Sequence, residues 1–351
     1  MERIKPIRIA GRAIGPGYPP YVIAEMSANH NGDLSSALRI IDEAKKAGAE
    51  AVKIQTYTAD TITLNCDSLD FQIKEGLWKG RTLHQLYEWA HTPWDWHKSL
   101  FEHARNAAIT IFSSPFDNSA VDLLEDLGAP AYKIASFEAI DLSLIRYCAS
   151  TGKPVVISTG MADEEEIAEA IAAVHDAGGR ELAILHCVSG YPAPASDCNL
   201  ATIPDMIERF GVITGLSDHT LDNTTAVTSV ALGASLIEKH VTLDRNRNGP
   251  DDSFSLEPRE LVALCQGVRD AWIALGRIDY GCKSSERGNV QYRRSLYFVK
   301  DLEEGELVTP DAVRSVRPGF GMAPKYLDEI LGHKVSRPVR KNTPVRKDDI
   351  K

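Results

Sequence analysis

The chain of 351 residues lacks any long hydrophobic run, which excludes a membrane-spanning helix of the usual length. Residues 1–9 carry charges but no apolar core, so we expect no secretory signal peptide. An excess of positive charge is also lacking, because 49 Asp and Glu outnumber 39 Lys and Arg and give a formal net charge of −10 at pH 7. A nucleic-acid partner would need a basic face. We therefore expect a cytoplasmic protein that binds neither nucleic acid nor membrane.

Cysteine is sparse, and no Cys-x-x-Cys pair occurs. The six cysteines are scattered along the chain: Cys66, Cys148, Cys187, Cys198, Cys265 and Cys282. This pattern argues against a disulfide or zinc framework and favours free thiols in a reducing compartment. A glycine fingerprint is missing as well, because "SANHNG" at 27–32 does not match G-x-G-x-x-G. A dinucleotide-binding fold therefore loses support.

What the sequence does contain is a regular alternation of short apolar runs with helical patterns. The apolar runs lie at 21–26, 51–55, 109–115, 131–136, 154–160, 182–188, 212–218 and 235–242. Helical spacing follows an Asp33 cap at 35–47 and recurs at 164–177 and 259–275. Eight such repeats within about 280 residues predict an α/β fold, a closed (β/α)₈ TIM barrel, rather than a doubly wound sheet.

The pattern changes near Gly281, and this change predicts the domain boundaries. Residues 1–282 are expected to form a TIM-barrel catalytic domain that opens with a Gly/Pro-rich hairpin. Residues 283–294 have the polar composition of a linker. Residues 295–351 combine short strand patterns, turn residues and one short helical pattern, so we expect a small β-rich domain.

Polar residues stand at the carboxyl ends of the predicted strands, where barrel enzymes place their chemistry. Three pairs are two residues apart, so each pair points to one side of its strand: Lys53 and Gln55, Ser217 and His219, Glu238 and His240. Two lysines, Lys53 and Lys133, combine with the hydroxyls of Ser114, Ser136, Ser158 and Ser217. This set predicts a site for a small phosphorylated carboxylate, with a Schiff-base lysine as the alternative.

Two histidines, His219 and His240, end neighbouring strands of the predicted barrel. Their neutral imidazoles can approach a common point and bind a divalent metal. Two protein ligands would leave coordination positions for water and a substrate oxygen, which is typical of a catalytic metal. Hydrogen bonding alone is the alternative role for both side chains.

Nine motifs together resemble the sialic acid synthase family. They are "VIAEMSANHNG" (22–32), "VKIQTY" (52–57), "FSSPFD" (112–117), "YKIASFE" (132–138), "VISTGM" (156–161), "LHCVSGYP" (185–192), "GLSDHT" (215–220), "IEKHVT" (237–242) and "GPDDSFS" (249–255). The tail, with "SLYFVKDLEEGELVT" and "VRPGFGMAP", resembles the antifreeze-like (SAF) domain of that family. The resemblance implies a transferase that condenses phosphoenolpyruvate with an amino-sugar aldehyde and releases phosphate.

The resemblance also implies roles for individual residues. Phosphoenolpyruvate would be held by Lys53, Ser114, Lys133, Ser136, Ser158, Ser189 and Ser217. His219 and His240 would hold the metal, usually manganese, with magnesium or cobalt as alternatives. Glu25 would serve as general acid and base, while Gln55, Tyr191, Asp251 and Arg317 would meet the sugar. Two positions depart from the family pattern: Ser114 stands where Thr is usual, and Ser189 stands where the longer Asn is usual.

Segment 76–97 and the tail are similar to the pseudaminic acid synthases within this family. That similarity implies 2,4-diacetamido-2,4,6-trideoxy-L-altrose as the acceptor sugar, with water as co-substrate, C–O cleavage, and pseudaminic acid and phosphate as products. Trp78 lies in this segment, in a long loop expected at the barrel mouth. The alternative is an N-acetylneuraminate or legionaminate synthase that uses an N-acetylmannosamine-like acceptor.

The family resemblance further implies a domain-swapped homodimer, in which Arg317 of each small domain reaches the barrel of the other chain. Two other hypotheses remain beside it. One is a carbohydrate- or ice-binding protein whose SAF-like tail is the working part. The other is a phosphoenolpyruvate-dependent synthase that acts on a phosphorylated sugar. Phosphate release from phosphoenolpyruvate in the presence of a sugar separates an enzyme from a binding protein.

Overall fold

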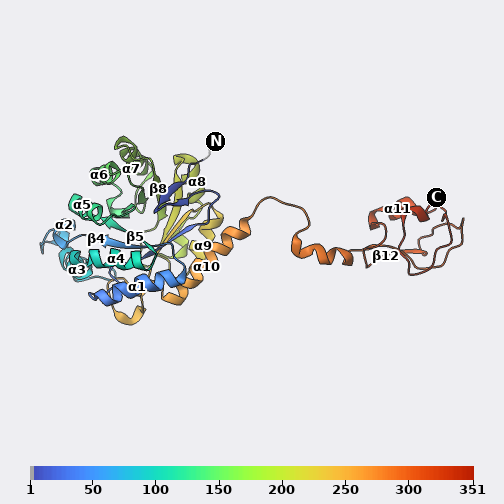
Figure 1. The fold of residues 1–351 in the computed structure, drawn as a ribbon, viewed down its shortest axis with the longest axis horizontal. Helices are drawn as coiled ribbons and strands as arrows, with labels where there is room; N and C mark the ends of the chain where they lie inside the picture. The colour runs from blue at the N-terminus through green and yellow to red at the C-terminus, as the bar shows by residue number, and fades with distance from the viewer. Residues whose placement is uncertain (1–3) are drawn as a thin grey trace. The chain divides into compact units, whose positions relative to one another are not determined.

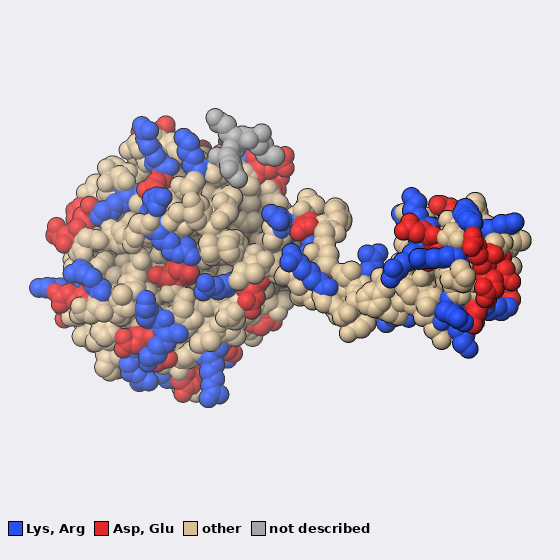
Figure 2. Space-filling model, turned by 45° about the vertical axis from the view of Figure 1, so that its right-hand side comes forward, with Lys and Arg blue, Asp and Glu red and all other residues tan. Residues whose placement is uncertain are grey.

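The computed structural model describes residues 4–351, which divide into two compact units. The first unit ends at Gly276, and the second spans Arg277–Lys351. None of the helices within residues 4–351 has the length and apolar character that a membrane crossing needs. On the face drawn in Figure 2, Lys and Arg are interspersed with Asp and Glu over the first unit.

The first unit is a closed barrel of parallel strands surrounded by helices (Figure 1). The strands are β3 (Tyr21–Glu25), β4 (Ala51–Thr56), β5 (Thr110–Pro115), β6 (Tyr132–Ile134), β7 (Val155–Ser158), β8 (Leu182–Cys187), β9 (Ile213–Asp218) and β10 (Leu236–His240). Each strand pairs with the next in the chain, and β10 closes the barrel against β3. The predicted TIM barrel is therefore confirmed.

Helices follow the strands and cover the barrel. They are α1 (Leu34–Ala47), α2 (Ala59–Ile62), α3 (Leu83–Ala90), α4 (His97–Asn106), α5 (Asn118–Asp126), α6 (Leu142–Ser150), α7 (Glu164–Asp176), α8 (Thr202–Phe210), α9 (Thr224–Ala231) and α10 (Pro258–Leu275). The predicted Asp33 cap is present, because its carboxylate accepts hydrogen bonds from the backbone N–H groups of Ser35 and Ser36. Short 3₁₀ turns occur in the loops, including η2 (Trp94–Trp96), η3 (Ser136–Glu138) and η6 (Asp252–Phe254).

The interior of the barrel is filled by alternate residues of each strand, as the two-residue period of a strand requires. The lower layers are apolar and buried: Tyr21, Ile23, Ala51, Phe112, Ala131, Val156, Ala183, Leu185, Ile213 and Leu236. The predicted hairpin, β1 (Ile7–Ile9) with β2 (Arg12–Ile14), adds Ile7, Ile9 and Ile14 to this cluster. The amino-terminal half of the barrel is therefore a packed apolar core. Side chains suited to chemistry lie in the carboxyl-terminal half.

The second unit contains a two-stranded antiparallel sheet of β11 (Ser295–Phe298) and β12 (Val313–Val316), and the short helix α11 (Leu327–Ile330). Its own core includes Leu296, Phe298 and Val345. Within the segment predicted as a polar linker, the 3₁₀ helix η7 covers Ser284–Tyr292. The Glu286 carboxylate accepts a hydrogen bond from the Lys283 backbone N–H at 2.7 Å, which caps this turn.

Candidate active site

Above the apolar layers, the same alternate strand positions turn polar. The residues of this upper layer are Glu25, Lys53, Ser114, Lys133, Ser158, Cys187, Ser217 and Glu238, and all are buried. These residues lie two positions after core residues of the same strands: Glu25 follows Ile23, and Lys53 follows Ala51. Their side chains therefore point into the barrel as well. The structure therefore brings the predicted lysines and strand-end serines into one layer at the carboxyl ends of the strands.

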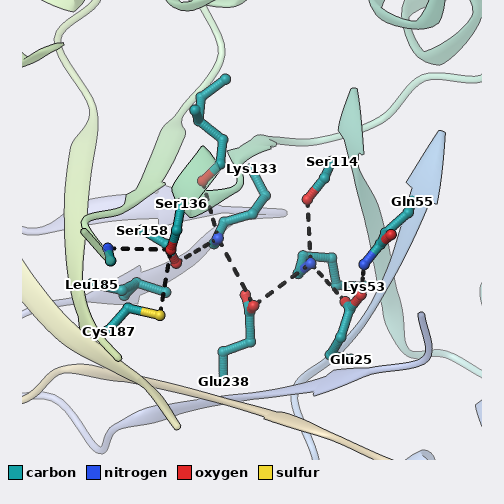
Figure 3. Close-up of polar contacts among 12 residues, drawn as sticks. Glu25, Lys53, Gln55, Ser114, Lys133, Ser136, Ser158, Leu185, Cys187 and Glu238 are labelled. Atoms are coloured by element: carbon teal, nitrogen blue, oxygen red, sulfur yellow. Dashed lines mark hydrogen bonds and ion pairs between the residues drawn. The ribbon is translucent and has the colours of Figure 1, made fainter. Parts of the chain in front are cut away.

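Two lysines and one glutamate form the centre of this layer (Figure 3). Lys53 Nζ lies 2.7 Å from Glu25 Oε2, and it donates to Ser114 Oγ at 3.2 Å. Lys133 Nζ donates to Ser158 Oγ at 2.7 Å. Glu238 lies between the lysines, with Oε1 3.6 Å from Lys53 Nζ and 3.9 Å from Lys133 Nζ. Ammonium groups and serine hydroxyls thus face a common space.

Burial and neighbouring charges shift the pKa values of these groups in opposite directions. Burial alone would lower the pKa of Lys53, but the Glu238 and Glu25 carboxylates outweigh it and leave that pKa raised. Burial lowers the pKa of Lys133, with partial compensation from Glu238. Burial also raises the pKa of Glu25, against the attraction of Lys53. A buried carboxyl whose pKa is raised is a candidate general acid and base.

Ser136, Cys187 and Ser189 form a second group on the neighbouring strands and loops. The Gly160 backbone N–H donates to Ser136 Oγ at 3.2 Å, and Ser136 Oγ lies 3.4 Å from Cys187 Sγ. Ser189 Oγ is 3.9 Å from the same sulfur. A Cβ at Gly160 would lie 2.3 Å from Ser189 Oγ and 2.8 Å from Ser136 Oγ, so only glycine leaves room for both hydroxyls. Cys187 was read as an ordinary free thiol, although the strand parity of "LHC" could have placed it here.

The two predicted histidines lie side by side, with ring centroids 5.4 Å apart. His219 Nδ1 is 2.8 Å from the Val188 carbonyl oxygen, and in the neutral ring donation to that oxygen leaves Nε2 without a proton. Burial lowers the pKa of His219, but the neighbouring Cys187 outweighs it and leaves that pKa raised. His240 Nδ1 is buried and has no hydrogen-bond partner. Burial first, and then the neighbouring His219 and Lys53, hold the pKa of His240 well below its usual value, so the imidazole is neutral.

These features fit a divalent cation bound by two neutral imidazoles. The His219 hydrogen bond fixes the ring as second-sphere carbonyls fix metal-ligating histidines, and His240 carries an unpartnered buried nitrogen. No group of three or more His, Cys, Asp or Glu side chains suited to a metal occurs within residues 4–351. A cation held here would therefore depend on this pair and on oxygen atoms from outside the chain.

Aromatic rings stand beside the histidine pair. The Tyr191 ring lies 4.4 Å from that of His219 and 5.2 Å from that of Phe254, measured between centroids. The indole of Trp78 is 6.0 Å from Tyr191, and its Nε1–H donates to the Pro250 carbonyl at 2.9 Å. The loop predicted to reach the barrel mouth thus contributes an indole next to a predicted sugar-binding residue.

A chain of hydrogen bonds links three more predicted residues, Glu25, Gln55 and Asp251. Gln55 Nε2 donates to Glu25 Oε1 at 2.9 Å and to Ser27 Oγ at 3.1 Å. Ser27 Oγ donates to Asp251 Oδ2 at 2.5 Å. Ser27 had no predicted role, and its partner lies 224 positions away, so only the fold could reveal it.

Two further residues, Glu138 and Arg317, lie outside these groups. Glu138 ends η3 after β6, and burial raises its pKa to about 7 while Lys133 opposes the shift. Glu138 belongs to the motif "YKIASFE" and had no predicted role. Arg317 is exposed and directly follows β12, in the second unit. All other predicted site residues belong to the barrel unit.

The fold and this cluster define a class: a TIM barrel whose carboxyl-terminal mouth gathers two lysines, serine hydroxyls and a histidine pair. Residues 40–280 match the model of the NeuB family, and residues 293–351 match that of the SAF domain. The chain belongs to the NeuB family and carries a C-terminal SAF domain.

Known relatives cover almost the whole chain. A pseudaminic acid synthase of Campylobacter jejuni is 44% identical over 331 residues, which are 94% of this chain and 96% of the relative. A pseudaminic acid synthase of Helicobacter pylori is 41% identical over 334 residues, covering 95% and 98%. The crystal structure of an N-acetylneuraminic acid synthetase from Leptospira borgpetersenii superposes with a TM-score of 0.74 at 30% identity, covering 83% of this chain and 97% of that one.

Proposed function

We propose that this protein condenses phosphoenolpyruvate with 2,4-diacetamido-2,4,6-trideoxy-L-altrose and water, giving pseudaminic acid and phosphate. The observation that carries the proposal is the meeting of Lys53, Lys133 and their serine partners with the pair His219 and His240 at one barrel mouth. Whole-length similarity to two pseudaminic acid synthases supports the choice of sugar. An N-acetylmannosamine-like acceptor is the alternative, favoured by the likeness to an N-acetylneuraminic acid synthetase.

Phosphoenolpyruvate would lie across the two lysines. Lys53 and Lys133 supply point charges for the phosphate and carboxylate, and the hydroxyls of Ser114 and Ser158 already bond to these ammonium groups. Ser136 and Ser189 would donate from the Gly160 side, and Ser217 from β9. Ser189 is shorter than the Asn usual in the family, so it would reach the ligand less directly.

Members of the NeuB family depend on a metal, and His219 and His240 would hold it here. Manganese is the proposed ion, with magnesium or cobalt as alternatives. When bound, a divalent cation supplies Lewis-acid polarisation of a carbonyl oxygen, such as that of the sugar aldehyde. The Val188 carbonyl would keep His219 in the tautomer that this role needs.

In the proposed reaction, the methylene carbon of phosphoenolpyruvate forms a bond to the aldehyde carbon of the sugar. Water then adds to the central carbon of the former enol, and the C–O bond to phosphate breaks. Glu25 would move the protons, because it is buried, has a raised pKa and is oriented by Lys53 and Gln55. Asp251, held by Ser27, would accept a hydrogen bond from a sugar hydroxyl, with Tyr191 beside it.

The aromatic wall supports a deoxy, diacetamido acceptor. Such a sugar presents a C6 methyl and an additional acetamido methyl, which the Trp78 indole could bury for about 0.8 kcal/mol per carbon. A hydroxylated sugar gains no such burial and leaves a hydroxyl unpaired, which costs about 1–3 kcal/mol. The indole is anchored by Pro250, directly before Asp251, so it would line the same sugar.

We further propose the domain-swapped homodimer, with Arg317 acting on the partner's barrel. The second unit carries 16 Lys and Arg against 11 Asp and Glu, whereas the first carries 23 against 38. Units of opposite net charge favour association between chains. Loops that follow the strands also expose apolar side chains, including Phe137 and Ile140 after β6 and Met161 after β7. Such groups are suited to being covered by a second subunit.

An isotope experiment tests the chemistry. Phosphoenolpyruvate labelled with ¹⁸O at the oxygen that bridges C2 and phosphorus is incubated with the sugar, Mn²⁺ and the full-length protein. C–O cleavage predicts that the released phosphate keeps the label, as mass spectrometry would show. Release of unlabelled phosphate would mean P–O cleavage and would overturn the proposed mechanism.

A further inference from the structure

Lys239 is a buried lysine that the proposed reaction does not use. It stands between Glu238 and His240 on β10, so strand parity turns it away from the barrel interior. It is only 2% exposed. Its environment therefore lies behind the active site, between the barrel and the covering helices.

The Lys239 ammonium group is fully hydrogen-bonded. Nζ donates to Asp218 Oδ2 at 2.7 Å, to the Thr220 carbonyl at 2.6 Å and to the Asp222 carbonyl at 2.7 Å, with Thr220 Oγ1 a further 3.3 Å contact. An ammonium has three protons, and three strong acceptors take them. Asp218 Oδ1 in turn accepts from the Thr220 backbone N–H at 2.9 Å. A charged, saturated arrangement of this kind holds its acceptors rigidly.

The acceptors flank His219 on both sides. β9 ends at Asp218, so His219 lies beyond the strand ladder, and its carbonyl accepts a hydrogen bond from the Ala193 backbone N–H at 3.0 Å. The His219 side chain itself has only the Val188 carbonyl, the weaker Cys187 contact and ring stacking to fix it. Lys239 is the group that joins the two sides of His219, because it binds Asp218, Thr220 and Asp222 together, whereas Asn223 Nδ2 donates separately to the Glu260 carbonyl at 3.0 Å.

We propose that Lys239 is a positioning residue that sets His219 for metal binding by pinning residues 218–222 from behind the barrel. The inference rests on the proposed function, because it takes His219 as a ligand. The inference links two motifs. In "SDH", His219 is a metal ligand and Asp218 is the carboxylate that binds Lys239. In "EKH", His240 is the second ligand and Lys239 holds the segment that contains His219.

A purely structural ion pair is the competing explanation, and it makes a different prediction. Removal of one partner of a buried ion pair lowers the unfolding temperature, because the other charge is left buried without compensation. Only a positioning role lowers metal affinity in protein that is still folded, since partners behind a metal ligand typically affect affinity by about 10–100-fold.

The test measures Mn²⁺ binding to the full-length protein without substrate, by the electron paramagnetic resonance signal of free Mn²⁺. Hydrogen exchange of the peptide spanning 218–223 is measured in parallel. The variants are Lys239→Met and the milder Asp218→Asn. The control is Lys153→Met, which removes a lysine–carboxylate pair away from the site, Lys153 Nζ to Glu125 Oε1 at 2.6 Å, between the loop before β7 and α5.

We expect Lys239→Met to bind Mn²⁺ about 10–100-fold more weakly and to exchange faster at 218–223. Asp218→Asn should show a smaller loss in the same direction, and the control should show neither change. Unaltered affinity in folded Lys239→Met overturns the inference. If that variant does not fold, wild-type affinity in Asp218→Asn overturns it instead. Failure of the unmutated protein to bind Mn²⁺ would contradict the proposed function, and unchanged exchange at 218–223 would then contradict the positioning role.

Discussion

At the scale of single residues, the account depends most on His219 and His240. Replacing either with Ala should reduce turnover by about 10³-fold or more, because a metal contributes several kcal/mol of charge stabilisation. The unfolding temperature should change little, since neither ring anchors the apolar core.

The measurement is phosphate release with Mn²⁺, alongside thermal unfolding. His186→Ala is the matched control, because His186 precedes Cys187 on β8 but points away, with Nε2 2.6 Å from the Cys198 carbonyl oxygen. Full activity of His219→Ala or His240→Ala in chelated buffer would refute the metal assignment.

Gly160 offers a second residue-scale prediction. Its backbone conformation is open to alanine, but a Cβ would reach 2.3 Å from Ser189 Oγ and 2.8 Å from Ser136 Oγ. Gly160→Ala should therefore displace both hydroxyls and raise KM for phosphoenolpyruvate by about 10-fold, in line with one or two lost hydrogen bonds. Gly190→Ala is the control, because its Cβ would meet nothing closer than 3.5 Å. An unchanged KM in Gly160→Ala would remove these serines from the phosphoenolpyruvate site.

At the scale of elements, periodicity predicted much of the fold. All eight strands begin and end within two residues of the predicted ranges, because alternating strands and helices leave a strong pattern. The same two-residue period predicted the inward lysines and serines. The 3₁₀ helix η7 was not predicted, because its polar composition resembles a linker and its contacts are local hydrogen bonds, such as those of Lys283 with Glu286 and of Gln291 with Gly288.

Sequence reasoning could not find contacts between distant elements. Ser27 meets Asp251, and Lys239 meets Asp218, through pairings that depend on barrel closure and loop path. The sequence could not show that position 160 requires glycine for a similar reason, because the space there is limited by two serines on other loops. Strand parity therefore predicts which residues face the interior, while the partners of each residue follow only from the three-dimensional structure.

The segment between β4 and α3 contains Trp78, which we expect to select the acceptor sugar. Trp78→Ala should lower kcat/KM for the deoxy diacetamido sugar by about 10-fold, because two methyl groups lose about 0.8 kcal/mol of burial each. The kcat/KM for N-acetylmannosamine should change little, so the ratio of kcat/KM between the two sugars becomes smaller.

Trp89→Ala is the control, since Trp89 lies in the same segment on α3, half exposed beneath Arg81. If Trp78→Ala affects both sugars equally, the indole does not select the acceptor.

At the scale of the whole molecule, the proposed swapped dimer predicts complementation. A chain with Arg317→Ala and a chain with Lys53→Ala should each be inactive alone. A mixed dimer would contain one site with both changes and one site with neither. Random mixing makes about half of the dimers mixed, so about a quarter of wild-type activity should return. Mixed dimers that form, as shown by differently tagged chains, and remain inactive would contradict action in trans.

The central claim is that this barrel joins phosphoenolpyruvate to a 6-deoxy diacetamido sugar at a metal-dependent site. The most direct measurement is the rate of phosphate release from phosphoenolpyruvate with Mn²⁺, compared between 2,4-diacetamido-2,4,6-trideoxy-L-altrose and N-acetylmannosamine. The account predicts release that requires both metal and sugar, with kcat/KM about 5–150-fold higher for the deoxy sugar, as a difference of about 1–3 kcal/mol implies. Equal constants for the two sugars, or no release with either, would contradict it.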